Sequence, residues 1–512
     1  MFSWMDVLSQ WKQGIPYPHW AAMAHWGYGE ARFLFYPAAS WMLGAALGAL
    51  FPWKAVPGAY CCLVLALAGF SMMALARQWL PSQDAVFAAI FYALNPYHLL
   101  IVYWRSAYAE LLAAVLLPLL LLCMWRITDP GWRPVLWLSL VLAASWLTND
   151  PAAIMIHYSA ALLAIVLCVQ RKSLLPALRA LLGVALSAGL VAFYLLPAMY
   201  EQRWVNIGEV LSAGVTPRDN FLFTTLADLD HNRFNLLVSL LAVAEGAVLG
   251  LSIVLARREP APRRSWSLLS LWGAATLLVM FPVSSFLWTY LPAFRFVQLP
   301  FRWLLCLNAA LAILLALATT AHTRGRWLAR AAACGALLAA LLVAARHTQM
   351  PWWDAAPDIA LMSRAVSTGA GYEGTDEYVP VGADPYEIDQ KLPRVSIDGS
   401  LVPLEMKAWR ADDKRFVVQT ASPTSITVRL FNYPSWQVLL NGKVVETQTT
   451  EITGLMRIPV PPGTNKVWIR QRRTSDQVAG DWTSAAFLVV FVIAWVKAGR
   501  VKAGRPELQE AT

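Results

Sequence analysis

The chain has 512 residues, of which 58% are hydrophobic and 14% are charged. Soluble domains carry about 25% charged residues, so this composition excludes an ordinary soluble protein and indicates an integral membrane protein. The net charge of +10 does not point to a nucleic-acid partner. Most of the excess lies in short loops between apolar segments, where positive charge sets membrane topology.

About eleven apolar segments approach the length of about 20 residues that a helix needs to cross a bilayer. They predict a polytopic helical membrane protein. The segments are 57–76, 84–101, 109–125, 134–149, 152–170, 177–197, 235–255, 266–288, 301–321, 329–346 and 483–498.

Arginine and lysine are concentrated in every second loop and in the C-terminal tail. Because positive loops stay in the cytoplasm, this asymmetry fixes a predicted orientation. The opposite loops are longer and mixed in charge, and we expect them to be extracytoplasmic. They are 97–108, 198–234, 288–300 and the polar region 347–482.

The N-terminal segment allows two interpretations. Residues 33–53 are apolar enough to be a further span, which would leave residues 1–32 in the cytoplasm. Alternatively, 33–53 lies at the outer interface or re-enters, and residues 1–56 are all outside, which is the arrangement we expect. No signal peptide is evident in residues 1–14. One explanation for an outer location is a span upstream of Met1.

The polar region 347–482 has the pattern of strands. Residues 425–431 and 466–472 alternate apolar and polar side chains, as half-buried strands do. Asn441-Gly442 lies between two strand-like runs, and this pair favours a type I′ hairpin turn. We therefore predict an antiparallel β-sandwich.

These patterns divide the chain into four predicted parts. They are an extracytoplasmic or interfacial first-loop segment at 1–56, a transmembrane helical domain at 57–346, an extracytoplasmic β-sandwich at 347–482, and a final span with a basic cytoplasmic tail at 483–512.

No motif of a soluble enzyme occurs, such as a Walker A loop or a His-Glu-x-x-His zinc motif. The candidates for function are ionisable side chains at the predicted outer ends of spans, because charges near lipid are costly. Carboxylates act as general bases or hold divalent cations, and arginines clamp phosphates. The candidates are Glu30 with Arg32; Arg105 with Glu110; Asp150; Glu201 with Arg203; and Arg295 with Gln298 and Arg302.

Simpler interpretations compete with these. Arg105 and Glu110 are equally consistent with interface residues that extend to water. Asp150, which precedes Pro151, is more simply a helix cap. Two arginines on the outer side oppose the positive-inside trend, so Arg295 and Arg302 favour a bound anion or an acidic partner.

Four stretches carry a family resemblance: PHWAAMAHWGYGEARFLFYPAASWMLGAAL, LNPYHLLIVYWRSAYAELLAAVLLPLLLL, FRFVQLPFRWL and Glu377-Tyr378-Val379-Pro380. They resemble the bacterial membrane proteins described as 6-pyruvoyl-tetrahydropterin synthase-related, over nearly the whole chain. That family is similar to GT-C glycosyltransferases, which take sugars from polyprenyl-phosphate donors on the extracytoplasmic face. In those enzymes the first outer loop carries a catalytic acid just after the first span. By resemblance, that span would precede Met1.

The resemblance implies a GT-C-like glycosyltransferase in the bacterial inner membrane, acting on a surface glycan, lipid or protein. Glu30 or Asp6 would be the base or metal ligand, and a divalent cation is one option for a cofactor. Neither acid clearly matches the family motif, and this favours the alternative, a non-catalytic protein that binds or moves a lipid-linked glycan. No residue is assigned as a metal ligand from spacing. The donor phosphate would be held by Arg105, Arg295 and Arg302, with Arg32, Glu110, Asp150, Glu201, Arg203 and Gln298 as further substrate-binding candidates.

Overall fold

The computed structural model describes residues 1–256, 263–320, 325–344, 346 and 355–503. The chain forms two compact units. The first, here called the β unit, comprises Met1–Pro57, Ala192–Val210 and Asp354–Trp482. The second, the helical unit, comprises Gly58–Val191, Leu211–Trp353 and Thr483–Thr512.

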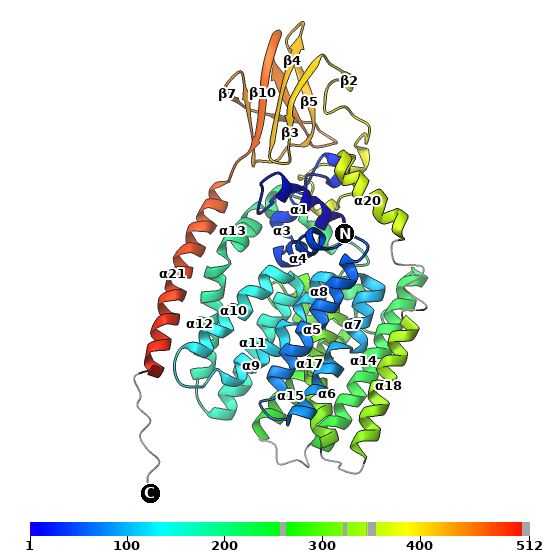
Figure 1. The fold of residues 1–512 in the computed structure, drawn as a ribbon, viewed down its shortest axis with the longest axis vertical. Helices are drawn as coiled ribbons and strands as arrows, with labels where there is room; N and C mark the ends of the chain where they lie inside the picture. Colours follow the sequence, from blue (N-terminus) through cyan, green and yellow to red (C-terminus); the bar gives the residue numbers. More distant parts are fainter. Residues whose placement is uncertain (257–262, 321–324, 345, 347–354, 504–512) are drawn as a thin grey trace. The chain divides into compact units, whose positions relative to one another are not determined.

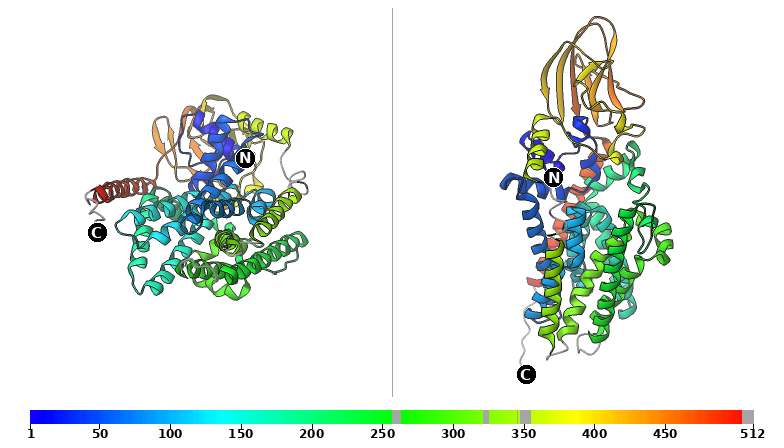
Figure 2. Two further views of the ribbon diagram at one scale, coloured as in Figure 1. Left: turned by 60° about the horizontal axis from the view of Figure 1, so that its bottom comes forward. Right: turned by 90° about the vertical axis from the view of Figure 1, so that its right-hand side faces the viewer.

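The long helices of the helical unit run side by side (Figures 1 and 2). Within this unit, α14 packs against α15 and α17, and α10 packs against α9, α11 and α12. The helices are α5 (Val56–Ala76), α6 (Ser82–Ala93), α7 (Pro96–Leu100), α8 (Tyr108–Ala113), α9 (Leu116–Arg126), α10 (Arg133–Thr148), α11 (Asp150–Arg171), α12 (Leu175–Leu190), α14 (Leu229–Ala256), α15 (Arg263–Val279), α16 (Ser285–Tyr290), α17 (Leu304–Thr320), α18 (Arg326–Ala344) and most of α21 (Ser475–Ala503).

Seven helices in the described part of the chain are long and apolar enough to cross a membrane, or nine if each of two bent pairs is one span. The prediction of about eleven spans is therefore not confirmed. Segment 134–149 corresponds to α10, which has only 16 residues. Segments 177–197 and 266–288 are helix pairs bent by 75° and 94°. The second bend coincides with Pro282, which cannot donate the backbone hydrogen bond that would continue a helix.

Some predictions concern residues outside the described ranges. Part of the predicted span 329–346 and most of the basic loop at 257–264 are among them. The end of the predicted C-terminal tail, beyond Ala503, also lies outside the described residues.

The N-terminal part of the β unit is helical but contains no long span. Residues 33–53 form α3 and α4, which are separated at Pro37, and α4 has 13 residues. Helix α1 packs against α4, where a Cβ on Gly44 would lie 2.2 Å from the Trp4 ring. Residues 33–53 therefore do not form one straight crossing helix. The helices of this unit are α1 (Phe2–Lys12), α2 (Ala24–Gly27), α3 (Arg32–Phe35), α4 (Ala38–Leu50), α13 (Ala192–Glu201) and α20 (Ala356–Thr368).

Two antiparallel five-stranded sheets form the C-terminal part of the β unit (Figure 1). Their apolar faces share one core, to which Ile426 and Val428 contribute from one sheet and Val438 and Ile469 from the other. The strand orders are β2-β1-β5-β9-β8 and β3-β4-β10-β6-β7. The strands are β1 (Val395–Ile397), β2 (Ser400–Leu401), β3 (Leu404–Trp409), β4 (Asp413–Thr420), β5 (Thr424–Phe431), β6 (Trp436–Leu440), β7 (Lys443–Val445), β8 (Gln448–Thr449), β9 (Leu455–Val460) and β10 (Gly463–Gln471).

The predicted hairpin is present. Strands β6 and β7 pair in antiparallel register, with Leu440 opposite Lys443. Asn441 and Gly442 have φ angles of 50° and 82°, which is the left-handed pair that a type I′ turn requires.

Hydrogen bonds join the N-terminal residues to the sheet region within the β unit. The Ala411 amide donates to Gln13 Oε1 at 2.9 Å, and the Thr375 amide donates to Glu30 Oε2 at 2.9 Å. Residues 1–32 and the sheets therefore pack together in one unit, and their predicted location outside the membrane stays a prediction.

Candidate functional site

One cluster of charged side chains in the helical unit surrounds Glu110, a residue of α8 whose side chain is 2% exposed. Arg105 Nη1 lies 2.8 Å from Glu110 Oε2, and Arg302 Nε lies 3.2 Å from the same oxygen. The Tyr97 hydroxyl donates to the other oxygen, Oε1. Two guanidinium groups therefore share one carboxylate.

The backbone brings Arg105 next to Glu110 by an interrupted helix. Asn95 caps α7 by accepting a hydrogen bond from the His98 amide. A short π-helix, η1 (Ile101–Arg105), follows and ends at Ser106, whose φ of 48° is left-handed. The chain then enters α8, so the side chains on either side of the break meet. π-Helical turns of this kind occur frequently at functional sites.

Arg302 comes from a distant segment, the 3₁₀ turn η7 (Pro300–Trp303). Its Nη1 donates to Gln298 Oε1 at 2.9 Å and to the Val297 carbonyl at 2.7 Å. These bonds orient the guanidinium while its Nε contacts Glu110. The predicted candidates Arg105, Glu110, Gln298 and Arg302 thus form one group, here called the Glu110 cluster.

The Glu110 cluster favours an anion. When all three are ionised, the two guanidinium groups and one carboxylate carry a net charge of +1. The side chains of Arg105 and Arg302 are 14% and 12% exposed, so they keep some access to their surroundings. Arginine forks match phosphate oxygens in two-pronged contacts.

Two other predicted residues do not join this cluster. The central carbon of the Arg295 guanidinium lies 5.1 Å from the centre of the Phe296 ring. In the described part of the chain, Arg295 makes no ion pair with Glu110. Asp150 is the first residue of α11, and the cap of that helix is Asn149, whose Oδ1 accepts from the Ala152 amide.

Glu201 and Arg203 belong to the β unit. Glu201 is fully buried and accepts hydrogen bonds from Tyr433 at 2.6 Å, Gln477 at 2.9 Å and Thr474 at 3.0 Å. These hydrogen bonds therefore join α13 to the sheet region. Arg203 stacks over the Tyr200 ring at 3.8 Å.

Glu30 is buried in a network of the β unit. It is 0% exposed and is paired with Arg32, and His25 Nε2 lies 2.9 Å from its Oε2. Burial acts to raise the pKa of Glu30, but Arg32 and His25 outweigh it and hold that pKa below its usual range. Glu30 is thus an ionised partner of the Arg32 guanidinium.

Asp6 is also fully buried. It accepts hydrogen bonds from Gln10 and the Met23 amide, both at 3.0 Å, and from Tyr372 at 3.4 Å. Burial raises the pKa of Asp6 to about 6, against the effect of these donors. Both N-terminal acids therefore have the surroundings of structural carboxylates, and the catalytic role assigned to either stays a prediction.

A family model described as "6-pyruvoyl-tetrahydropterin synthase related domain; membrane protein" matches residues 33–350. The chain belongs to this family. No protein in a search of curated sequences matches it. In this PTPS-related membrane protein the matched region contains the whole Glu110 cluster, whereas Asp6 and Glu30 precede it.

Glu377 was not among the predicted site residues of this PTPS-related protein. It opens the Glu377-Tyr378-Val379-Pro380 element and is partly exposed. Burial raises its pKa, and the nearby charge of Glu30 adds to this effect. The sequence signal was present, since this element is one of those that carry the family resemblance.

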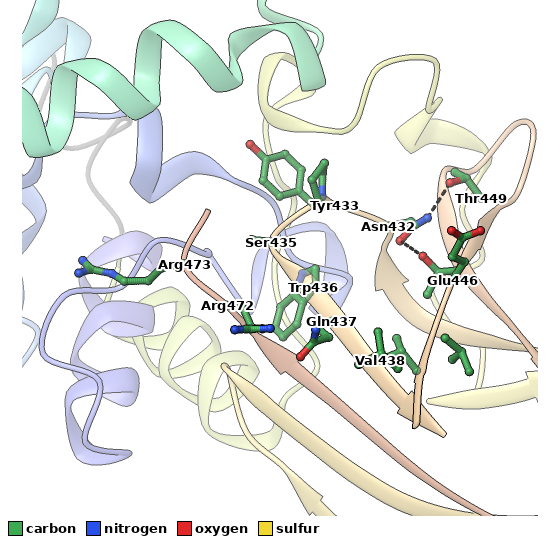
Figure 3. Close-up of a pocket in the computed structure, with 14 residues that line it drawn as sticks. Asn432, Tyr433, Ser435, Trp436, Gln437, Val438, Glu446, Thr449, Arg472 and Arg473 are labelled. Atoms are coloured by element: carbon green, nitrogen blue, oxygen red, sulfur yellow. Dashed lines mark hydrogen bonds between the residues drawn. The ribbon is translucent and has the colours of Figure 1, made fainter. Parts of the chain in front are cut away.

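One pocket of the β unit, of about 640 Å³, is lined by residues of β6, β7 and the chain that follows β10. Figure 3 shows Arg472 beside Trp436 and Gln437, with Asn432 bonded to Thr449. This combination of an aromatic ring, amides and a cation suits a polar, hydroxyl-rich ligand.

A smaller pocket of the β unit, of about 220 Å³, is lined by two tryptophans and three basic side chains. Lys414 is only 3% exposed, and its Nζ lies 4.3 Å from the Trp436 ring centre. Burial lowers the pKa of Lys414 to about 7. Arg394 stacks over the ring of Trp409 at 5.4 Å.

The described residues offer little for a metal ion. Among them, no three His, Cys, Asp or Glu side chains lie close enough together to bind one.

Proposed function

We propose that this PTPS-related protein binds a polyprenyl-phosphate-linked sugar in the bacterial inner membrane and, as a GT-C-like glycosyltransferase, transfers the sugar to a surface glycan, lipid or protein. The observation that carries the proposal is the Glu110 cluster. Two orientated arginines share one carboxylate at the junction of two candidate membrane spans, Ser82–Arg105 and Tyr108–Arg126.

The position of the cluster suits a lipid phosphate. The tail of such a ligand stays among apolar helices, whereas its phosphate needs cationic partners where a span is interrupted. Arg105 and Arg302 supply these, and Gln298 fixes the direction of the Arg302 fork. A free sugar phosphate would use the same arginines without needing a membrane segment.

The proposed reaction balances without a further reactant. An acceptor hydroxyl oxygen forms a bond to the anomeric carbon, and the bond between that carbon and the phosphate oxygen breaks. The polyprenyl phosphate leaves with the bonding electron pair, and the hydroxyl proton passes to a carboxylate base. The arginines stabilise charge that develops on the departing phosphate. The resemblance to GT-C enzymes, and not the geometry of the Glu110 cluster, is the basis for proposing Glu30 or Asp6 as this base.

A second candidate function is binding or translocation of the lipid-linked glycan without chemistry. The full burial of Asp6 and Glu30, both engaged by hydrogen-bond donors, favours it. This candidate needs only the Glu110 cluster.

Purified protein incubated with a panel of polyprenyl-phosphate sugars tests both candidates. A transferase releases polyprenyl phosphate when an acceptor is added, and Glu30→Gln or Asp6→Asn abolishes the release. A binding protein retains the lipid-linked sugar unchanged. If no polyprenyl-phosphate sugar binds at all, both candidates are wrong.

A further inference from the structure

A second buried acid lies within the helical unit, away from the Glu110 cluster. Glu245 belongs to α14, in the candidate span Leu229–Ala256, and is 5% exposed. Asn308 of α17 is fully buried, and its Nδ2 donates to Glu245 Oε2 at 2.8 Å. Ionisable residues inside membrane spans are expensive and are functional candidates for that reason.

The orientation of the Asn308 amide follows from its second contact. The same Nδ2 lies 2.9 Å from the Leu304 carbonyl, which can only accept a hydrogen bond. The atom there must therefore be the donor, and the amide cannot be flipped. Both hydrogens of Nδ2 are then used, one by Leu304 and one by Glu245.

Two buried oxygens are left without a donor among the described residues. They are Glu245 Oε1 and Asn308 Oδ1. Leaving a buried acceptor unsatisfied is unfavourable, and burying an unpaired carboxylate costs far more. A proton on Oε1 would make Glu245 neutral, and it would supply a donor for Asn308 Oδ1, the other end of the amide that already bonds Oε2.

Among the described residues, the charged groups of α14 and of the elements packed most closely against it do not offer Glu245 a counter-ion. On α14 itself the nearest is Arg233, 12 residues away and so about 18 Å along the helix. Helix α17 contributes one titratable group, Cys306. Of the other elements against α14, η7 contributes Arg302, which is bonded to Glu110, and α15 contributes arginines only at its first turn.

The pair Asp84 and Arg330 provides the contrast within the same unit. Asp84 is also buried in a candidate span, but Arg330 Nη1 lies 2.6 Å from its Oδ1. Asp84 therefore has a guanidinium group as its partner, whereas Glu245 has a neutral amide in the equivalent place.

We propose that Glu245 and Asn308 form a proton-binding site, in which a neutral carboxylic acid joins α14 to α17 through two hydrogen bonds. The ligand of the site is a proton. Loss of that proton would leave a carboxylate facing an amide oxygen, so protonation stabilises the contact between the two helices.

Infrared difference spectra of the full-length protein in detergent at pH 7 test this proposal. Subtracting the spectrum of Glu245→Gln from that of the wild type should reveal the C=O band of one protonated carboxyl. The matched variant Asp84→Asn should remove carboxylate bands instead. Loss of carboxylate bands in Glu245→Gln would overturn the proposal.

Stability gives an independent readout. Glu245→Gln keeps a neutral group of the same shape and should shift the thermal midpoint little, whereas Asp84→Asn strands a buried guanidinium and should lower it clearly. If Glu245→Gln does not fold, Asn308→Ala replaces it, and the protonated band should move to higher frequency as its partner is lost. A band that stays in place in Asn308→Ala would contradict the pairing.

Discussion

Arg302 Nε lies 3.2 Å from Glu110 Oε2, although the two residues are 192 positions apart in the chain. This contact joins the turn before α17 to the start of α8. Together with the contact between Arg105 and Glu110, it orientates both arginines of the cluster. Preorganised donors of this kind bind a charged group without the entropy loss of ordering their own side chains.

Replacing Glu110 should separate stability from anion binding. Glu110→Gln removes the carboxylate shared by Arg105 and Arg302. We therefore expect the free energy of unfolding to fall by about 1–3 kcal/mol, and the thermal midpoint to fall with it. The net charge of the three side chains rises from +1 to +2, so affinity for a polyprenyl phosphate should not fall. Glu451→Gln, at an exposed position, is the control and should change neither quantity. A loss of affinity in Glu110→Gln would mean that the carboxylate itself contacts the ligand.

Tyr433 should matter for stability through Glu201. Tyr433→Phe removes a buried donor at 2.6 Å from that carboxylate, and such a loss costs about 1–3 kcal/mol. Tyr386 bonds Asp376 at 2.8 Å but is 76% exposed, so Tyr386→Phe is a matched control expected to cost under about 0.5 kcal/mol. Equal thermal midpoints for the two variants would show that the hydrogen bond from Tyr433 to Glu201 does not stabilise the protein.

The stability of the β unit should rise with pH above neutrality. Burial lowers the pKa of Lys414 to about 7, whereas an unfolded lysine titrates near pH 10.4. Between these values the unfolded chain binds a proton that the folded chain has released, so the free energy of unfolding increases as pH rises. In Lys414→Met, the thermal midpoint should change less with pH between pH 7 and 10. Lys443→Met, at an exposed position, should keep the slope, and an unchanged slope in Lys414→Met would contradict the assignment.

Thiol labelling should report the same membrane face for both ends of the β unit. In a cysteine-free background, Asn441→Cys and Lys12→Cys, both at exposed positions, should react with a membrane-impermeant reagent on intact cells once any outer membrane is permeabilised. The basic loops predict that this face is extracytoplasmic. Labelling of both only after lysis would reverse the orientation. Labelling of one alone would contradict the hydrogen bonds between Gln13 and Ala411.

The features that sequence predicted well are those with local causes. Asn441-Gly442 produced the hairpin because its turn type depends on two residues. Arg105 and Glu110 met because only a short break separates them. The count of about eleven spans is not confirmed, because two of the predicted segments are bent helix pairs. Two others, 134–149 and 329–346, correspond to shorter apolar helices in the described part of the chain.

Long-range contacts were not predictable in the same way. Arg295 and Arg302 are seven residues apart, and this spacing suggested that they converge on one ligand. The structure places them in separate 3₁₀ turns, divided at Gln298 with its φ of 65°. Only Arg302 reaches Glu110. The pairing of Glu245 with Asn308 depends on which helices are neighbours, which periodicity alone does not reveal.

Equilibrium binding of a polyprenyl phosphate to the purified protein in detergent tests the central claim most directly. One charge-assisted hydrogen bond contributes about 1.5–3 kcal/mol, so Arg302→Ala should bind roughly 10- to 150-fold more weakly than the wild type while folding normally. Arg302→Lys should recover only part of the affinity, because an ammonium cannot make the two-pronged contact. Arg295→Ala is the control from the neighbouring turn and should bind as the wild type does. If Arg302→Ala folds and binds polyprenyl phosphate with unchanged affinity, the Glu110 cluster is not the phosphate site.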